Sequence, residues 1–318
     1  MRVELAEQAL ELYGLDYARI LSVQTGYRNH IFPVELHDGT MVQLTLYKSE
    51  PDILARIQRS DTVSGFAAEK GLPTRTRKDP RTIRMRGSTK DIFAALYNYL
   101  PGETIAWEAY TTSHLKSLGK TMSDLHGALK DFDTTSQILV IDELESLLGR
   151  MRRYFEAKEV MRAMHDKLSL TFSVSFDRYE RLLSGCRALQ GTQQLHMDFV
   201  RGNVLFDRQE ITGILDFEKT SVGHPLFDVA RTLAFLLVDC KYKTEDEVRR
   251  YFLQSGYHKR GASKLDYYPG LLERLVEFFL LHDFYKFLRH NPYESLNDNE
   301  HFVRTVSMLT RGGVLHYT

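Results

Sequence analysis

The chain has 318 residues, of which 43% are hydrophobic and 26% are charged, and its 42 basic and 42 acidic side chains balance. This length allows one large domain or two lobes, and the composition is that of an ordinary globular protein. The zero net charge excludes the strong overall field with which basic proteins attract nucleic acids, so we expect no nucleic-acid partner.

The N-terminus, the apolar runs and the cysteines together indicate a cytoplasmic protein. The first residues, Met-Arg-Val-Glu-Leu-Ala-Glu, lack the apolar core of a signal peptide. No apolar run reaches the length that spans a membrane, so we expect no membrane association. Cys186 and Cys240 fall in helical patterns and suggest neither a disulfide framework nor a metal knuckle.

The first hundred residues predict a small sheet and two helices. Spaced leucines predict a short amphipathic helix over 3–13, and a longer helix is expected over 50–70. Residues 75–86 predict a basic hairpin that turns at Asp79-Pro80; we interpret it as a solvated sheet face, with an acidic ligand or RNA as the alternative. Further strands are expected at 20–23, 31–36, 42–47 and 92–100.

A turn between the first two predicted strands carries Gly26 and Asn29. A glycine lets backbone N–H groups approach a phosphate, and an asparagine tolerates the left-handed backbone that such a turn can need. An ordinary hairpin turn uses the same residues, so both interpretations stay open at this point.

From residue 108 onward the pattern is mainly helical. Thr112 or Ser113 is expected to cap the first of these helices, whose end carries His126. Further helices are expected at 140–166, 173–190, 226–239, 244–255, 266–289 and 298–310.

Residues 196–218 place three polar side chains on an apolar background. Asp198 lies in a loop, Asn203 follows it, and Asp216 falls at the exit of a hairpin predicted over 204–215. Phosphoryl transfer needs a carboxylate that orients and deprotonates a hydroxyl, and oxygen ligands for the Mg²⁺ that accompanies a triphosphate. Asp198 is the candidate base, and Asn203 and Asp216 are candidate metal ligands.

The pattern His196-x-Asp-x4-Asn-x2-Phe, followed by Ile-Leu-Asp216-Phe-Glu, resembles the aminoglycoside phosphotransferase superfamily, which includes choline kinase and type II homoserine kinase. Met197 and Glu218 stand where protein kinases carry Arg and Gly. The resemblance implies an α+β, two-lobed protein-kinase-like fold. Residues 1–97 would form a small antiparallel-sheet lobe that binds nucleotide, and 98–318 a mainly helical lobe for catalysis and acceptor binding.

The resemblance also implies roles for individual residues. His196 would brace the catalytic loop, Asp228 would hold its backbone, and Arg201 would face the transferred phosphate or the acceptor. His126 would pack beneath the loop. The implied nucleotide-binding positions are Gly26 and Asn29 in a covering loop, and Asn98, Tyr99 and Leu100 in a hinge whose backbone contacts adenine.

One position departs from the family pattern. Most members carry Lys or Arg on the strand at 42–47 to hold the α- and β-phosphates, whereas this chain has Thr45. Strand alternation directs Lys48 to the opposite face, so it reaches the phosphates only if the strand ends or twists there; otherwise it is a solvated surface residue. Asp61 is the candidate carboxylate partner on the following helix.

The leading hypothesis is Mg²⁺-dependent transfer of the γ-phosphate of ATP or GTP to a hydroxyl of a small molecule, such as an amino sugar, antibiotic, amino alcohol or homoserine-like acceptor. A catalytically idle nucleotide-binding pseudokinase is the alternative, favoured by Thr45. A protein kinase ranks third, because only eight residues separate Asp216 from Pro225, too few for a peptide platform. Neither the acceptor nor the oligomeric state follows from the sequence.

Overall fold

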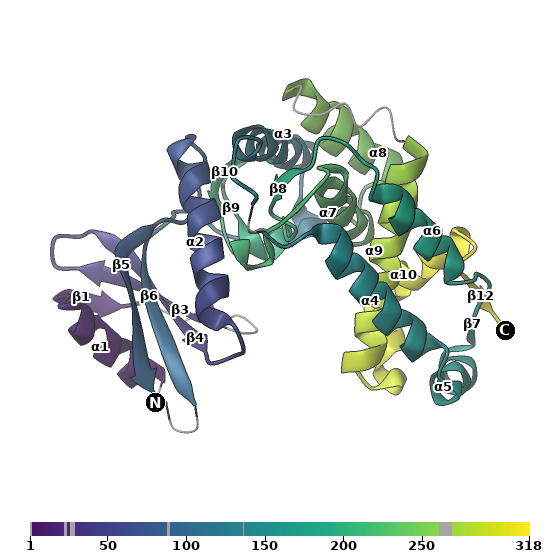
Figure 1. The fold of residues 1–318 in the computed structure, drawn as a ribbon, viewed down its shortest axis with the longest axis horizontal. Coiled ribbons are helices and arrows are strands. Elements are labelled where there is room, and N and C mark those ends of the chain that lie inside the picture. Colours follow the sequence, from purple (N-terminus) through teal and green to yellow (C-terminus); the bar gives the residue numbers. More distant parts are fainter. Residues whose placement is uncertain (1, 22–23, 26–28, 88–89, 136, 261–268) are drawn as a thin grey trace. The chain divides into compact units, whose positions relative to one another are not determined.

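The computed structural model describes residues 2–21, 24–25, 29–87, 90–135, 137–260 and 269–318 (Figure 1). Two compact units divide the chain. The first unit is Met1–Glu103 with Asn203–Glu218, and the second is Thr104–Gly202 with Lys219–Thr318. Each unit is built around its own set of elements.

The first unit contains one antiparallel sheet in the order β1-β3-β4-β6-β5, with β2 paired to β3. Two helices accompany the sheet. The bounds are α1 (Arg2–Tyr13), β1 (Tyr17–Ile20), β2 (Gln24–Thr25), β3 (Asn29–Leu36), β4 (Met41–Lys48), α2 (Ile53–Glu69), β5 (Arg77–Arg86) and β6 (Asp91–Asn98).

Side-chain alternation gives this sheet two apolar faces. Val42 and Leu44 of β4 join a buried cluster with residues of α1, whereas Tyr47 packs with Ile53 and Ile57 of α2. Figure 1 shows α1 and α2 on opposite sides of the sheet. Because successive strand residues point to opposite faces, each side chain of β4 lies on the face of α1 or on the face of α2.

The predicted turn at Asp79-Pro80 is wrong. β5 runs through these residues, and its register with β6 shifts between Arg77 and Thr82. Proline lacks the N–H that a regular ladder needs, and β5 is an edge strand of the sheet, where such an irregularity is tolerated.

The hairpin of β9 (Val204–Asp207) and β10 (Glu210–Ile214) belongs to the first unit through its backbone hydrogen bonds. The Ile214 N–H donates to the Pro73 carbonyl at 2.7 Å, and the Phe206 N–H donates to the Glu103 carbonyl at 2.9 Å. The lobe boundary predicted at 97/98 places this hairpin in the second lobe, whereas it belongs to the first unit. The nucleotide and acceptor roles of the two lobes stay predictions.

The second unit is mainly helical. Two short antiparallel ladders accompany its helices: β8 (Gln193–Leu195) pairs with β11 (Ser221–Gly223), and β7 (Leu170–Phe172) pairs with β12 (Leu315–Tyr317). The main helices are α3 (Thr112–Leu129), α4 (Val140–Phe155), α5 (Lys158–Leu168), α6 (Asp177–Cys186), α7 (Leu226–Asp239), α8 (Glu245–Arg249), α9 (Pro269–His290) and α10 (Glu300–Arg311).

Two local predictions for these helices need correction. Thr111, not Thr112 or Ser113, caps α3: its hydroxyl accepts from the His114 N–H at 3.3 Å, and its own N–H donates to Nδ1 of His114 at 3.0 Å. The helix predicted over 140–166 is divided into α4 and α5, because the chain becomes extended at Ala157. In the described part of the chain, every helix is too short or too polar to cross a bilayer.

Candidate active site

The loop after β8 is held by one buried carboxylate in the second unit. The backbone N–H groups of His196 and Met197 donate to Asp228 at 2.9 and 3.0 Å. Asp228 lies in the first turn of α7, and its Oδ2 is 3.2 Å from Nε2 of His126. Burial alone would raise the pKa of Asp228, but His126 and His196 lower it, so the carboxylate stays charged.

Asp198 follows in this loop and is almost fully buried. Lys219 Nζ lies 2.7 Å from its Oδ2, and a guanidinium nitrogen of Arg231 lies 2.9 Å from its Oδ1. Burial alone would raise the pKa of Asp198, but Arg231 and Lys219 outweigh burial and hold it below its ordinary value. Asp198 is therefore an ionised hydrogen-bond acceptor at neutral pH, able to orient a hydroxyl.

In the first unit, Asn203 and Asp216 lie at the two ends of the β9–β10 hairpin. The Leu215 N–H donates to the Asn203 carbonyl at 2.8 Å. This hydrogen bond joins the backbone of Asn203 to that of the residue before Asp216. An amide oxygen and a carboxylate suit Mg²⁺, which takes few protein ligands and completes its shell with phosphates and water. Elsewhere among the described residues, no three His, Cys, Asp or Glu side chains converge as a metal site.

Met197 and Asp216 both have left-handed backbone, with φ of 57° and 56°. A non-glycine residue in this region carries strain, on the order of 1–3 kcal/mol, that the surrounding structure must sustain. At Met197 the two hydrogen bonds to Asp228 span this turn. At Asp216 the Glu218 N–H donates to its Oδ1 at 3.2 Å and fixes the carboxylate.

Asn29 connects β3 to the turn after β10. Its side-chain amide donates to Glu218 Oε1 at 2.7 Å, while Arg56 of α2 lies 3.2 Å from Oε2. Burial and the neighbouring Asp216 raise the pKa of Glu218. Asn29 thus contacts Glu218, which follows the candidate metal ligand Asp216 by two residues. Gly26, the other residue predicted for the covering loop, lies outside the described residues.

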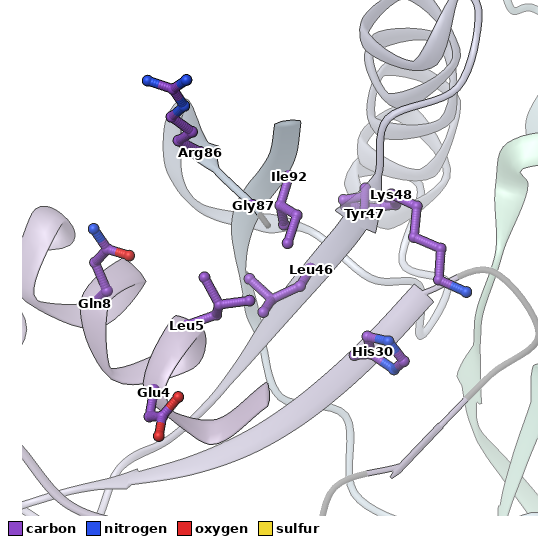
Figure 2. A pocket seen from close by; sticks show the side chains of 10 residues that line it. All are labelled: Glu4, Leu5, Gln8, His30, Leu46, Tyr47, Lys48, Arg86, Gly87 and Ile92. Carbon is purple, nitrogen blue, oxygen red and sulfur yellow. The ribbon is translucent and has the colours of Figure 1, made fainter. Parts of the chain in front are cut away.

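The strand position that lacks the family cation is fully buried. Thr45 Oγ1 accepts from the Gln43 amide at 3.4 Å on the α2 side of the sheet. Lys48 is exposed at the end of β4 and lines a pocket of about 400 Å³ with residues of α1, among them Glu4 and Gln8 (Figure 2).

Arg75 is a buried cation on the α2 side. Its guanidinium lies 3.9 Å from the ring centroid of Tyr97 and donates to the Tyr47 hydroxyl at 3.1 Å. The Tyr97 hydroxyl in turn donates to Asp61 at 3.0 Å, and Asp61 accepts from Arg77 at 2.5 Å. Thr45 and Tyr47 lie on the same face of β4. The two tyrosines therefore hold the Arg75 guanidinium on the face where Thr45 supplies no charge.

Arg75 also interacts electrostatically with the candidate metal ligand. A parallel bridge joins Thr74 to Ile214, so Arg75 follows the bridge by one residue on its segment and Asp216 follows it by two on the other. Burial disfavours the charge of Arg75, but the two tyrosines, Asp61 and Asp216 raise its pKa, so the guanidinium is always charged. The prediction of a solvated basic face is therefore wrong for Arg75.

The predicted hinge residues close β6. The Asn98 N–H donates to the Thr76 carbonyl at 2.9 Å, and its side-chain amide donates to the Thr76 hydroxyl at 2.7 Å. The Asn98 N–H is therefore committed to Thr76 and is not available to adenine. Tyr99 and Leu100 follow as half-buried residues outside the strand.

Arg201 is exposed at the start of a short 3₁₀ turn in the second unit. Asp198 belongs to the same unit, whereas Asn203 belongs to the first. Five residues of chain hold the Cα atoms of Asp198 and Asn203 within about 18 Å of each other in any arrangement of the units.

Sequence reasoning missed three cations of the candidate site: Lys219 and Arg231, which contact Asp198, and Arg75, which interacts electrostatically with Asp216. Signals for them existed. Arg75 follows Pro73 closely in a chain whose strand cation is missing at Thr45. Arg231 lies three residues after Asp228, hence on the same face of α7. Nothing local in the sequence indicates that Lys219 turns toward Asp198.

A family model described as APH, phosphotransferase enzyme family, matches residues 20–261. Similar solved structures include amicoumacin kinase hAmiN in complex with AMP-PNP, Ca²⁺ and Ami, at 14% identity over 98% of this chain and 94% of that chain, with a TM-score of 0.70. A microcompartment-associated aminopropanol kinase matches at 13% identity over 99% and 100%, with a TM-score of 0.65. The macrolide 2′-phosphotransferase MphH from Brachybacterium faecium matches at 18% identity over 96% and 97%, with a TM-score of 0.61. Comparison with curated proteins finds no match.

Proposed function

This chain belongs to the phosphotransferase enzyme family and has its α+β, kinase-like fold, and on that premise we propose that it transfers the γ-phosphate of ATP or GTP to a hydroxyl of a small molecule. The observation that carries the proposal is the ionised, buried Asp198 in a loop whose backbone is bonded to Asp228. The ATP analogue and divalent cation in the hAmiN complex agree with it.

Asp198 would orient the acceptor hydroxyl and take its proton. A pKa below the ordinary aspartate value makes the carboxylate a weak base. Weak basicity suits a loose transition state, in which the hydroxyl proton leaves late and positioning contributes most. Lys219 and Arg231 would keep the carboxylate ionised and fixed in direction.

Asn203 and Asp216 would hold Mg²⁺ against the phosphates. The bound ion would neutralise charge on the β- and γ-phosphate oxygens. Glu218 and its partner Asn29 would position Asp216 through the Glu218 N–H. His196 would brace the loop, because its Nδ1 accepts from the Asp198 N–H at 3.1 Å.

Arg75 would supply the cation that Thr45 does not. Its guanidinium is fixed by Tyr47 and Tyr97, is buried rather than solvated, and interacts electrostatically with Asp216, the proposed metal ligand. We assign it the role of holding nucleotide phosphates from a neighbouring segment, with Asp61 as the acid of its network.

The test is Mg²⁺-dependent loss of the γ-phosphate of ATP and GTP across a panel of hydroxyl acceptors, with Asp198→Asn as the matched control. Acceptor-stimulated turnover should fall by roughly two to four decades in Asp198→Asn while nucleotide binding persists. Near-normal turnover in this variant would disprove the assigned role of Asp198.

A catalytically idle nucleotide-binding module is the second candidate, favoured by Thr45. Nucleotide binding with no turnover on any acceptor would support it over the kinase. The presence of Arg75 weakens it, because the charge that Thr45 lacks is restored from another segment.

A further inference from the structure

We propose that the acceptor carries an anionic group, a carboxylate or a phosphate, in addition to the hydroxyl that receives the phosphoryl group. The inference rests on the proposed phosphotransferase function and names the substrate class of the same site. It is carried by four side chains of the second unit, here called the cationic cluster: the three cations Lys219, Arg231 and Lys286, and the neighbouring His282, which is neutral at pH 7.

Two members of the cationic cluster contact Asp198 directly. Lys219 and Arg231 lie 2.7 and 2.9 Å from its two carboxylate oxygens, so two positive charges face one negative charge. Arg231 is buried, and its Nε has no hydrogen-bond acceptor among the residues that the structure describes. A buried guanidinium with an unused donor is costly, and a nearby anion would offset part of that cost.

The other two members lie on α9, where Lys286 extends the positive charge. The Arg231 guanidinium lies 5.9 Å from the ring centroid of Phe279, which fixes the point where α7 meets α9. His282 and Lys286 follow Phe279 by three and seven residues, and therefore share its helix face. A rise of 1.5 Å per residue puts Lys286 about 10 Å farther along the axis, a span that suits a small acceptor.

The pKa shifts of these groups indicate an excess of positive charge. Burial lowers the pKa of Lys286 to about 8, and Arg231 and Lys219 add to the effect against partial opposition from Asp283 and Asp198. Burial also lowers the pKa of His282, and the neighbouring charges of Lys286 and Arg231 lower it further.

The nearest carboxylate of α9 is already engaged. Asp283 Oδ2 lies 2.5 Å from Nε2 of His301, whose Nδ1 lies 2.5 Å from Asp239. Among the described residues of the second unit, positive charge thus exceeds negative charge beside Asp198, in the partly desolvated place where the proposed function puts the acceptor hydroxyl. Such a surface attracts an acidic acceptor and repels a polycationic one.

The experiment uses pairs of acceptors that differ only in the acidic group: serine and ethanolamine, threonine and 1-aminopropan-2-ol, homoserine and 3-aminopropan-1-ol, and glycerol 3-phosphate and glycerol. In at least one pair we expect the acidic member to have a kcat/KM roughly 10- to 100-fold higher, the scale of one or two charge-assisted contacts. The last pair separates a phosphate from a carboxylate as the preferred anion.

Lys286→Met tests the cluster without touching the proposed base. For the acidic acceptor its kcat/KM should fall roughly tenfold, mainly through KM, and for the partner that lacks the acidic group the fall should be clearly smaller. The exposed Lys130 provides the matched control, and Lys130→Met should leave both values unchanged.

Phosphoryl transfer that favours the member without the acidic group in every pair would overturn the inference and leave the proposed function standing. If no acceptor is phosphorylated, the proposed function fails for this panel, and a binding measurement then tests the anion site. With saturating AMP-PNP and Mg²⁺, inorganic phosphate or serine should raise the Tm of the wild type above a chloride control of equal ionic strength. Loss of this rise in Lys286→Met supports an anion site, and no rise in the wild type overturns it.

Discussion

Asp198 and Arg75 are buried charged groups whose partners decide what they can do. Asp198 is ionised because Lys219 and Arg231 compensate its burial. Arg75 is charged, and two tyrosines fix the position of its guanidinium. In both cases the neighbouring side chains set the direction of the charged group, and direction is what phosphoryl transfer requires.

We expect substitutions of Arg75 and Lys48 to differ in their effect on nucleotide affinity. Arg75→Met should weaken Mg²⁺-dependent AMP-PNP binding by roughly 10- to 100-fold, the scale of a lost charge-assisted contact, and Arg75→Lys should recover part of it. Lys48→Ala should leave the affinity unchanged, because Lys48 is an exposed residue of the α1-side pocket (Figure 2).

Calorimetric titration measures these affinities, and circular dichroism checks that each variant is folded. An unchanged affinity in a folded Arg75→Met protein would remove Arg75 from the nucleotide site. A large loss in Lys48→Ala would instead return the family role to Lys48.

His301 should make stability depend on pH. Burial lowers its pKa, but hydrogen bonds to Asp239 and Asp283 raise it to about 9 from an ordinary value of 6.5. The stabilisation from its charged form is therefore fully present below pH 6.5 and is lost as the pH rises through 9. The unfolding free energy of His301→Gln should lie furthest below that of the wild type at low pH and approach it near pH 9.

Urea unfolding at a series of pH values measures this difference. The exposed His316 supplies the control, since His316→Gln should track the wild type throughout. A deficit for His301→Gln that stays constant between pH 6 and 9 would mean that the pair of aspartates does not hold the protonated form.

At the scale of elements, α3 supports the loop after β8 through His126, which contacts Asp228. His126 contacts Asp228 at 3.2 Å and the Tyr257 hydroxyl at 2.7 Å, so α3 is coupled to both the loop support and the segment after residue 250. That coupling needs close backbone approach: a Cβ at Gly119 would lie 2.1 Å from the Phe252 carbonyl oxygen.

Two glycines of α3 therefore differ in their tolerance of alanine. Gly119→Ala should destabilise the protein by about 1–3 kcal/mol, because backbone on the facing segment cannot move aside cheaply. A Cβ added at Gly127 would meet no atom within 4 Å, so Gly127→Ala should be neutral or stabilise by up to about 1 kcal/mol.

Chemical denaturation of the two variants measures both free energies. Equal effects of the two substitutions would show that the close packing of α3 at Gly119 is not required. If Gly119→Ala lowers stability as expected, acceptor-stimulated turnover per folded molecule should also fall, because His126 and Asp228 lose their fixed positions.

At the scale of the whole molecule, the first unit carries the proposed nucleotide and metal residues and the second carries the proposed base and the cationic cluster. Each unit has its own hydrogen-bond network: Asn29 with Glu218 in the first, and His126 with Asp228 in the second. These networks exist only in the folded protein. A ligand that binds only the folded protein stabilises it by mass action.

Mg²⁺ with AMP-PNP at 100 times its Kd should add about 2.7 kcal/mol to the free energy of unfolding. Asp216→Ala should lose the Mg²⁺-dependent part of this gain, whereas Asp198→Asn should retain it, because only Asp216 is a proposed metal ligand. Thermal unfolding with and without EDTA measures the difference. Equal stabilisation of both variants by Mg²⁺ would contradict the assignment.

The sequence by itself determined the family, the kinase-like fold and the spacing of Asp198, Asn203 and Asp216. The pairing of Asn203 with Asp216 follows from local geometry, because one short hairpin brings the two ends of this segment together, as the bond from Leu215 to Asn203 illustrates. Most strands and helices followed for the same reason, since their periodicity is local, whereas the hairpin predicted at 75–86 is a single strand.

Only the tertiary structure decided which charges compensate one another. Arg75 meets residues of β4 and β6 through sheet register, and Arg231 meets Asp198 33 residues away through the packing of α7 on the loop. The sequence alone does not show whether a basic residue is solvated or buried. Its environment depends on contacts between segments distant in the chain, and those contacts distinguish exposed Lys48 from buried Arg75.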